Sequence, residues 1–260
     1  MKTAFITLSR EGASLIPPLQ QEFGEIDCYL HEAVSPVDGC QSFSHIAGLT
    51  REIFPRYRAL IYAAPCGVVV RSIAACLASK LTDPAVVVLD VGARWAVSLL
   101  SGHEGGANDL AVRVSNIFDA EAVVSTTTEA VKDLIVGVGC RRGIACKRIV
   151  DAVQQSLTAV NMPLSRVRLL ASAVLKRDEL GLIQAAAELK VPLRFLSMEQ
   201  IGQCPRAVAQ SDFVRKSIGI PAVAEPAALL AGRRTALLLP KTIYSSVTVA
   251  IAKESCTSLA

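Results

Sequence analysis

The chain has 260 residues, of which 52% are hydrophobic, 19% charged and only 5% aromatic, and its formal net charge is +4. This length allows one or two domains, and an abundance of Ala, Val and Leu is typical of parallel sheets covered by helices. So small a positive charge gives no reason to expect a nucleic-acid partner. No apolar run approaches the roughly 18 residues of a membrane span. Arg10 and Glu11 interrupt the N-terminus too early for a signal peptide, so we expect a cytoplasmic protein without a membrane segment.

Eight cysteines are spread along the chain without a C-x-x-C pair, and no histidine lies at zinc-finger spacing from them. In a cytosolic chain such cysteines are free thiols, and several of them serve as small core residues. We therefore expect no metal site.

Hydrophobic periodicity predicts strands alternating with helices in the first half of the chain. Pro17 and Pro18 should disturb the first helix, and residues 33–48 give no clear assignment. The two-residue link at 91–92 predicts a β-hairpin. The expected strands are 3–8, 26–31, 59–64, 85–90, 93–100 and 122–126, and the expected helices are 13–23, 68–81 and 106–118.

A second series of alternating elements starts at Asp133. Asp178 begins a helix with an acidic first turn, which complements the helix dipole, and Ser197 is expected to cap a short helix. The expected strands are 134–139, 167–172, 192–196, 235–239 and 247–252, the expected helices are 144–160, 178–189, 198–201, 213–217 and 223–231, and residues 203–212 are expected to be a loop. We predict an α/β protein of two doubly wound domains, residues 1–130 and 131–260, with mostly parallel sheets and a cleft between them.

A glycine-rich stretch from Ser98 to Asp109 places three glycines within five positions around His103. It joins an expected strand to an expected helix, where backbone N–H groups can approach a ligand closely and the helix N-terminus favours anions. Histidine is the side chain whose unperturbed pKa lies near neutrality. The alternative is an ordinary connection that binds nothing, because the stretch lacks the spacing of a dinucleotide site and the Lys-Ser/Thr of a phosphate loop.

Three glycine-containing turns follow expected strands, at residues 65–67, 101–108 and 140–143. Ligands of open α/β sheets collect at the carboxyl ends of the strands. We therefore expect all three turns on that edge and a ligand site in the cleft between the domains.

Several basic residues near expected strand ends are candidates for holding carboxylates, because arginine offers a planar fork and lysine a point charge. They are Arg71, Arg141, Arg142, Lys176 and Lys241. The alternative is that long basic side chains only solvate a surface, which we prefer for Lys147 and Arg148. Glu225 lies in an apolar stretch and is either a buried carboxylate with a purpose or an exposed helix start.

Several of these stretches, taken in order, resemble the cobalt-precorrin-5A hydrolase family, the CbiG proteins of the anaerobic cobalamin pathway. The resemblance covers about residues 46–253. The matching motifs are Pro65-Cys66-Gly67 with Arg71 to Ala74, Lys80 to Val88, Ser98 to His103 with Gly105 to Asn108, Gly137 to Gly143, Lys176 with Asp178-Glu179, Val223 to Glu225 with Ala227-Ala228, and Lys241 with Val247 to Ala250. Many family members carry a further segment between the two domains, whereas only about residues 126–133 join them here.

The resemblance implies two α/β domains and a hydrolysis reaction. That reaction opens the δ-lactone of cobalt-precorrin-5A and expels acetaldehyde, which gives cobalt-precorrin-5B. The partner is a small cobalt-tetrapyrrole; the cobalt belongs to the substrate, and no cofactor is implied. A homo-oligomer and transient contacts with neighbouring pathway enzymes are compatible with this picture.

A polyacidic macrocycle needs cations around it, and lactone opening needs a base and donors for the oxyanion. Our hypothesis is that His103 activates the water, that the N–H groups of Gly105 and Gly106 stabilise the oxyanion, and that Glu225 is an alternative base or orients His103. The other candidate contacts are Ser101, Gly102, Asn108, Gly67, Arg71, Arg141, Arg142, Lys176 and Lys241. Two alternatives stay open: a non-catalytic tetrapyrrole-binding or carrier protein, and an unrelated α/β enzyme for a phosphorylated substrate.

Overall fold

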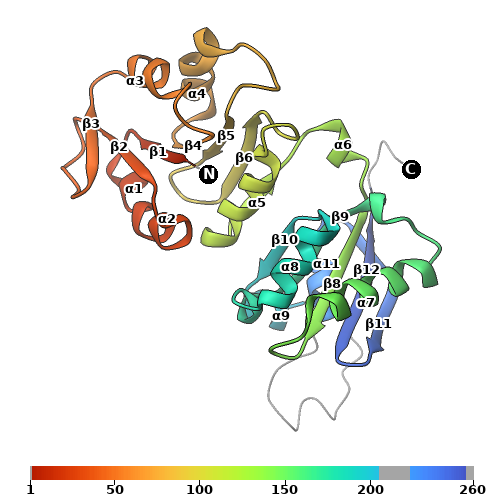
Figure 1. The fold of residues 1–260 in the computed structure, drawn as a ribbon. Coiled ribbons are helices and arrows are strands. Elements are labelled where there is room, and N and C mark those ends of the chain that lie inside the picture. The colour runs from red at the N-terminus through yellow and green to blue at the C-terminus, as the bar shows by residue number, and fades with distance from the viewer. Residues whose placement is uncertain (1, 205–222, 256–260) are drawn as a thin grey trace. The chain divides into compact units, whose positions relative to one another are not determined.

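The computed structural model describes residues 2–204 and 223–255, and the chain divides into two compact units, residues 1–126 and 127–260 (Figure 1). Each unit has its own sheet with helices packed on it, which confirms the predicted α/β fold class. Among the helices of the described residues, none has the length and apolar character needed to span a membrane.

The first unit is built on a seven-stranded sheet in the order β3-β2-β1-β4-β5-β6-β7. Its first five strands are mutually parallel, β6 runs antiparallel to β5, and β7 runs parallel to β6. The predicted hairpin between β5 and β6 is therefore confirmed. The strands are β1 (Thr3–Thr7), β2 (Asp27–His31), β3 (Cys40–Phe43), β4 (Ala59–Ala63), β5 (Ala85–Leu89), β6 (Trp95–Leu100) and β7 (Glu121–Val123).

Helices cover both faces of this sheet, so the unit is doubly wound, as predicted. One face carries α1 (Arg10–Ala13), α2 (Ile16–Phe23) and α5 (Ala107–Phe118). The other carries α3 (Ile46–Ile53) and α4 (Cys66–Ile73), which continues as the 3-10 turn η1 (Ala74–Cys76). Strands β1, β4 and β5 are buried along their whole length, as continuous apolar strands between two helical layers should be.

The predicted helix 13–23 is in fact two helices, and the prolines do not disturb the second. They lie in the first turn of α2, where a missing N–H costs no intrahelical bond and the fixed φ suits a helix. The stretch 33–48, which gave no clear assignment, contains the edge strand β3 and the start of α3. Polar residues at this exposed edge hide the usual periodicity.

The predicted helix 68–81 is also displaced, since α4 begins at Cys66 and ends at Ile73. Pro65 is its N-cap, so the expected turn 65–67 is partly helical. Beyond η1 the Asp83 carboxylate accepts the N–H groups of Ala78 and Ser79. These local side-chain hydrogen bonds replace helical ones and hold residues 77–83 as a loop.

The second unit is built on a five-stranded sheet in the order β10-β9-β8-β12-β11. Its first three strands are parallel, β12 is antiparallel to β8, and β11 is antiparallel to β12. The strands are β8 (Leu134–Cys140), β9 (Val167–Ala173), β10 (Leu193–Leu196), β11 (Thr235–Tyr244) and β12 (Val247–Glu254).

Helices α7 (Cys146–Ala159) and α8 (Leu180–Leu189) pack on one face of this sheet, and α11 (Ala224–Leu230) packs on the other (Figure 1). The shorter elements are α6 (Thr127–Ala130), η2 (Leu164–Arg166), η3 (Val174–Lys176) and α9 (Met198–Gly202). Ser197 caps α9 as predicted, and its hydroxyl accepts the Gln200 N–H.

Two boundaries in this unit differ from prediction. Helix α8 begins at Leu180, so Asp178 and Glu179 precede it and do not form an acidic first turn. The expected strand 235–239 continues to Tyr244, past a ladder irregularity around Pro240. The predicted helix 213–217 and most of the predicted loop 203–212 lie outside the described residues.

Candidate functional site

The glycine turn, residues 101–106, lies at the amino edge of the first sheet. Because β6 runs antiparallel to β5, its last residue Leu100 pairs with Val86 near the start of β5. Gly67 instead follows the carboxyl end of β4, where Ala63 pairs with Leu89 at the end of β5. The two turns therefore lie at opposite edges of one sheet, and the prediction that they share the carboxyl edge is wrong.

Backbone hydrogen bonds close the glycine turn on itself. The Ser101 carbonyl accepts the N–H groups of Gly105 at 3.1 Å and Ala107 at 3.2 Å, and the Gly102 carbonyl accepts that of Asn108 at 3.0 Å. These bonds occupy N–H groups that a helix N-terminus would otherwise offer to an anion. The Gly105 N–H already has an acceptor in the Ser101 carbonyl, and its predicted role in stabilising an oxyanion stays a prediction.

Two residues of the turn have a left-handed backbone. Gly106, the N-cap of α5, has φ 85°, and Ser101 has φ 56°, which is uncommon for a residue with a side chain. Ser101 is also buried, and no described residue accepts from or donates to its Oγ. Both features of Ser101, the left-handed backbone and the buried hydroxyl without a described partner, are destabilising, and such features cluster at functional sites.

Asn108 locks the turn in place. Its buried side chain accepts a hydrogen bond from Ser98 Oγ at 2.8 Å and donates to Thr126 Oγ1 at 3.0 Å. A Cβ at Gly102 would lie 2.6 Å from Thr126 Cγ2, so only glycine fits there without movement. Both residues hold the turn against residue 126 in this structure.

His103 lies exposed on the glycine turn, beside a charged pair. Its neighbour Glu104 binds Lys80, with 2.9 Å between Oε1 and Nζ. The hydrogen bond from Lys80 lowers the pKa of the Glu104 carboxyl, and the His103 charge acts in the same direction. Sequence reasoning left Lys80 out of the site, although it opens one of the matching motifs.

At the opposite edge of this sheet, Arg71 is turned back on its own helix. Its Nη1 donates to the Gly67 carbonyl at 2.9 Å while the side chain stays exposed. The structure therefore brings Gly67 and Arg71 together, and places neither beside the glycine turn.

At the carboxyl edge of the second sheet, the turn after β8 lies against the segment after β9. Arg142 donates to Asp178 Oδ2 at 2.8 Å and to the Leu175 carbonyl at 3.1 Å. Gly143 N–H donates to both carboxylate oxygens of the buried Glu179, each at 3.1 Å. Arg142, predicted to hold a ligand, is thus engaged in joining two segments, and its guanidinium lowers the pKa of Asp178.

Arg141 and Lys176 are the cations that this edge leaves open. Arg141 is exposed and forms no ion pair with any described residue, and Lys176 is half-buried. Burial raises the pKa of the Cys140 thiol; the Lys176 charge opposes that rise and the Glu179 charge adds to it. The Lys176 ammonium therefore lies within electrostatic reach of the end of β8. We call Arg141 and Lys176 the cationic edge; Lys241 lies apart from them on β11, which β12 separates from β8.

Glu225 is buried in the first turn of α11, so the alternative of an exposed helix start is wrong. Its Oε1 accepts the N–H of Lys241 at 2.8 Å, and its Oε2 has no partner among the described residues. The β11 ladder is irregular between Leu239 and Thr242, which leaves the Lys241 N–H available for Glu225.

Close packing fixes the position of α11 over β8. A Cβ at Gly137 would lie 1.9 Å from the Ala224 carbonyl oxygen, whereas a Cβ at Gly139 would meet nothing closer than 3.7 Å. Gly137 thus lets the helix carrying Glu225 approach the sheet directly.

The structure brings the predicted residues together in groups within each unit. The first unit joins Ser101, Gly102, Gly105, Gly106 and Asn108 around His103, and the second joins Arg141, Arg142 and Lys176, with Glu225 bound to Lys241. A cleft shared by the two units, and an action of Glu225 on His103, stay predictions.

The cysteines of the described chain are free thiols, of which Cys28 is buried. Four others, Cys40, Cys76, Cys140 and Cys146, pack at the margins of the cores. Within residues 2–204 and 223–255, no three His, Cys, Asp or Glu side chains come together in a way that could hold a metal ion.

These features define a two-domain α/β protein with a polar site at one edge of each sheet. Family models described as "Cobalamin synthesis G N-terminal" and "Cobalamin synthesis G C-terminus" match residues 48–129 and 134–252. The chain belongs to the CbiG family, and its role is in cobalamin biosynthesis.

Individual relatives agree with this assignment. The chain is 23% identical to the cobalt-precorrin-5A hydrolase of Salmonella typhimurium, over 86% of this chain and 88% of that protein. It is also 23% identical to the enzyme of the same name from Priestia megaterium, over 96% and 94%. The alignments span 322 and 353 positions, more than the 260 residues here, so both relatives contain positions that this chain lacks.

A solved structure of CobE, a protein from the cobalamin (vitamin B12) biosynthetic pathway, is 34% identical. The match covers 47% of this chain and 90% of CobE, with a TM-score of 0.43.

Proposed function

We propose that this chain is a cobalt-precorrin-5A hydrolase. The observation that carries the proposal is that both family domains occur in one chain, which covers 88% and 94% of the two relatives bearing that name. The substrate is a cobalt-tetrapyrrole edged with carboxylates, and the reaction needs no resident cofactor. We propose the cytoplasm as its location.

The proposed reaction consumes one water. The water adds to the lactone carbonyl, the ring C–O bond breaks, and a carboxylate and a hydroxyl result. Loss of the hydroxyl proton then allows the adjacent C–C bond to break. Acetaldehyde leaves, while the electron pair and a proton pass to the macrocycle. The protein must supply a base, donors for the oxyanion and cations for the carboxylates.

His103 is the proposed base. Its imidazole is exposed on the glycine turn, where water and substrate can reach it. In this proposal the N–H of Gly106, the N-cap of α5, donates to the oxyanion. Glu225 is the alternative base, supported by a buried oxygen without a partner among the described residues. In this proposal Arg141, Lys176 and Lys241 hold substrate carboxylates.

Acetaldehyde release from cobalt-precorrin-5A tests the proposal. We expect His103→Ala to lower kcat about 10²- to 10⁴-fold, the usual contribution of a general base. His45→Ala is the matched control, because His45 is also exposed in the first unit but precedes α3. A His103→Ala enzyme that works at the parent rate would remove His103 from the mechanism, and loss of activity in Glu225→Gln would then assign the base to Glu225.

A second candidate function is a non-catalytic tetrapyrrole carrier. The specific observation is that the protein CobE from a Sinorhizobium species, whose name states no reaction, is 29% identical over 48% of this chain and 83% of that protein. A carrier would bind cobalt-precorrin-5A stoichiometrically and release no acetaldehyde, so the same assay separates the two functions.

A further inference from the structure

A loop that the proposed mechanism does not use lies against the glycine turn. This recognition loop comprises residues 77–83, between η1 and β5. Lys80 reaches across to Glu104, and a Cβ at Gly105 would lie 3.4 Å from the Asp83 carbonyl oxygen. The loop and the turn that carries His103 are therefore neighbours at the amino edge of the first sheet.

Hydrogen bonds hold the backbone of the recognition loop in one conformation. The buried Asp83 carboxylate accepts the N–H groups of Ala78 and Ser79 at 3.1 to 3.2 Å. In return, the Ser79 carbonyl accepts the N–H groups of Thr82 and Asp83 at 3.0 and 2.8 Å, and Ser79 Oγ accepts that of Leu81. A surface loop with so many internal bonds is preorganised.

This ordered backbone presents apolar side chains to solvent. Leu81 is 72% exposed and Leu77 is 49% exposed, on either side of Lys80. The Lys80–Glu104 pair is itself exposed, with side-chain exposures of 74% and 33%, and such pairs contribute little to stability. Folding does not explain why a rigid loop holds two leucines and an ammonium outward next to His103, whereas contact with a ligand does.

We propose that the recognition loop binds the tetrapyrrole at the His103 site. Leu77 and Leu81 contact the apolar face of the macrocycle, and Lys80 exchanges Glu104 for a carboxylate on the rim of the ring. Glu104 is then an internal competitor that occupies Lys80 until substrate arrives. This inference rests on the proposed substrate class, and it adds residues that bind substrate without taking part in the chemistry.

Substituting either partner of the Lys80–Glu104 pair tests the proposal, because the two substitutions should shift Kd in opposite directions. Binding of cobyrinic acid, a cobalt corrin with several carboxylates, is measured by calorimetry at low salt. We expect Lys80→Gln to raise Kd about 2- to 5-fold, the range for loss of one exposed charge contact, and Glu104→Gln to lower Kd by freeing Lys80. An ion pair that only supported the fold would give both variants the same direction of change.

Matched controls exist for each change. Lys147→Gln removes another exposed lysine paired with a carboxylate, Asp151 at 3.3 Å, and should leave Kd unchanged. Leu81→Gln should raise Kd about 3- to 10-fold through lost apolar contact, whereas Val91→Gln, in the hairpin at the opposite edge of the sheet, should not. Circular dichroism verifies that each variant is folded.

The outcomes separate this inference from the proposed function. If Lys80→Gln and Glu104→Gln shift Kd the same way or not at all, or Leu81→Gln binds like the parent, the inference is overturned, even if acetaldehyde is released normally. If the parent protein binds the corrin with the expected pattern but releases no acetaldehyde, the recognition loop stands and the hydrolase proposal fails. If the enzyme is active, a binding role for Lys80 predicts that Lys80→Gln raises KM and leaves kcat unchanged.

Discussion

The glycine turn of the first unit and the turn after β8 in the second both end a strand and precede a helix, yet they use their polar groups differently. In the first, carbonyls such as that of Ser101 occupy the N–H groups of the turn itself. In the second, the Glu179 carboxylate accepts the Gly143 N–H, while Arg141 and Lys176 form no ion pair with any residue that the structure describes. The glycines of the first turn therefore allow its backbone conformation, whereas the second turn presents the cations Arg141 and Lys176 to a ligand.

The two turns also differ in the edge they occupy. The cationic edge lies at or toward the carboxyl ends of parallel strands, where ligands of open α/β sheets collect. The glycine turn lies at the amino edge, because the antiparallel strand β6 returns the chain to the start of β5. A rule about strand ends therefore locates a ligand site only when strand direction is known.

The largest expected effect comes from the packing beneath the second site. Gly137→Ala would place a Cβ 1.9 Å from the Ala224 carbonyl oxygen, so α11 must move away from β8. We expect a loss of about 3 kcal/mol of unfolding free energy in the second unit, as for overpacked cores. Gly139→Ala, whose nearest contact would be 3.7 Å away, is the matched control and should be tolerated.

Hydrogen exchange of peptides containing β8 and α11 measures this difference, while the single tryptophan, Trp95, reports on the first unit alone. Faster exchange in β8 with unchanged Trp95 fluorescence is the expected result. Equal protection in both variants would show that α11 does not depend on glycine at position 137.

The next effect concerns Asn108, which bonds Ser98 and Thr126. Asn108→Ala leaves two half-buried hydroxyls without this partner, and we expect a loss of about 1 kcal/mol from the first unit, followed by Trp95 fluorescence during denaturant unfolding. If Asn108 only holds the turn, kcat and KM measured well below the melting temperature should stay close to those of the parent. A normal melting curve together with a raised KM would instead support its predicted contact with substrate.

Much of the fold follows from local patterns. The buried strands β1, β4, β5, β8 and β9 lie within one or two residues of their predicted bounds, because continuous apolar runs between turns have few other solutions. The predictions that failed are those decided by side-chain hydrogen bonds or by exposure at a sheet edge, which hydrophobic periodicity does not register. Asp83 ends the hydrogen bonding that a longer α4 would need, and polar edge positions hide β3.

The candidate site was less predictable for a related reason. Residue type singled out His103 and Glu225, and the latter is buried with one oxygen that no described residue pairs. Sequence could not show that Arg142 is bound to Asp178, or that the Gly105 N–H is already used, because these are pairings in space. It also passed over Lys80, whose importance comes from its place beside Glu104.

A smaller effect tests whether the cationic edge binds anions. Lys176→Gln removes a charge that no described carboxylate pairs, and we expect about a 2- to 5-fold rise in the Kd for cobyrinic acid and a weaker dependence of binding on salt. Arg142→Gln is the contrasting variant, because Arg142 is already paired with Asp178. Its binding should change less than that of Lys176→Gln. Equal effects of the two variants would remove the distinction between open and engaged cations.

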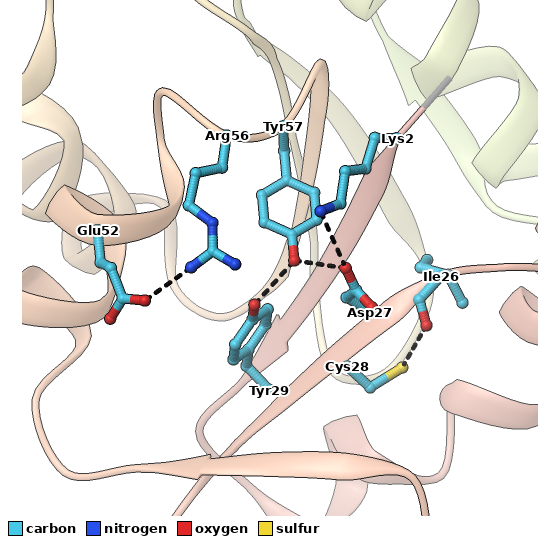
Figure 2. A network of polar contacts seen from close by, with 8 residues as sticks. All are labelled: Lys2, Ile26, Asp27, Cys28, Tyr29, Glu52, Arg56 and Tyr57. Carbon is cyan, nitrogen blue, oxygen red and sulfur yellow. Dashed lines mark hydrogen bonds and ion pairs between the residues drawn. The ribbon is translucent and has the colours of Figure 1, made fainter.

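The amino edge of the first sheet also holds a polar network that is fully paired, in contrast to Ser101 on the same edge. Figure 2 shows the Tyr57 hydroxyl between Asp27 and Tyr29, with Lys2 beside the carboxylate. Tyr57 donates to Asp27 Oδ2 at 2.5 Å and lies 2.8 Å from the Tyr29 hydroxyl, and Lys2 is 3.9 Å from the same Asp27 oxygen. This network joins the starts of β1 and β2 to the segment that precedes β4.

The smallest predicted effect is the pH dependence of this network. Burial, with the hydrogen bond to Asp27, raises the pKa of Tyr57. As pH rises through about 10, the unfolded chain loses the tyrosine proton while the folded protein retains it, so unfolding free energy falls with alkalinity. Tyr57→Phe should cost about 1 kcal/mol at pH 7 and flatten this alkaline decline, measured by Trp95 fluorescence in urea at pH 7 to 11. An unchanged slope would mean that Tyr57 ionises as readily in the folded protein as in the unfolded chain.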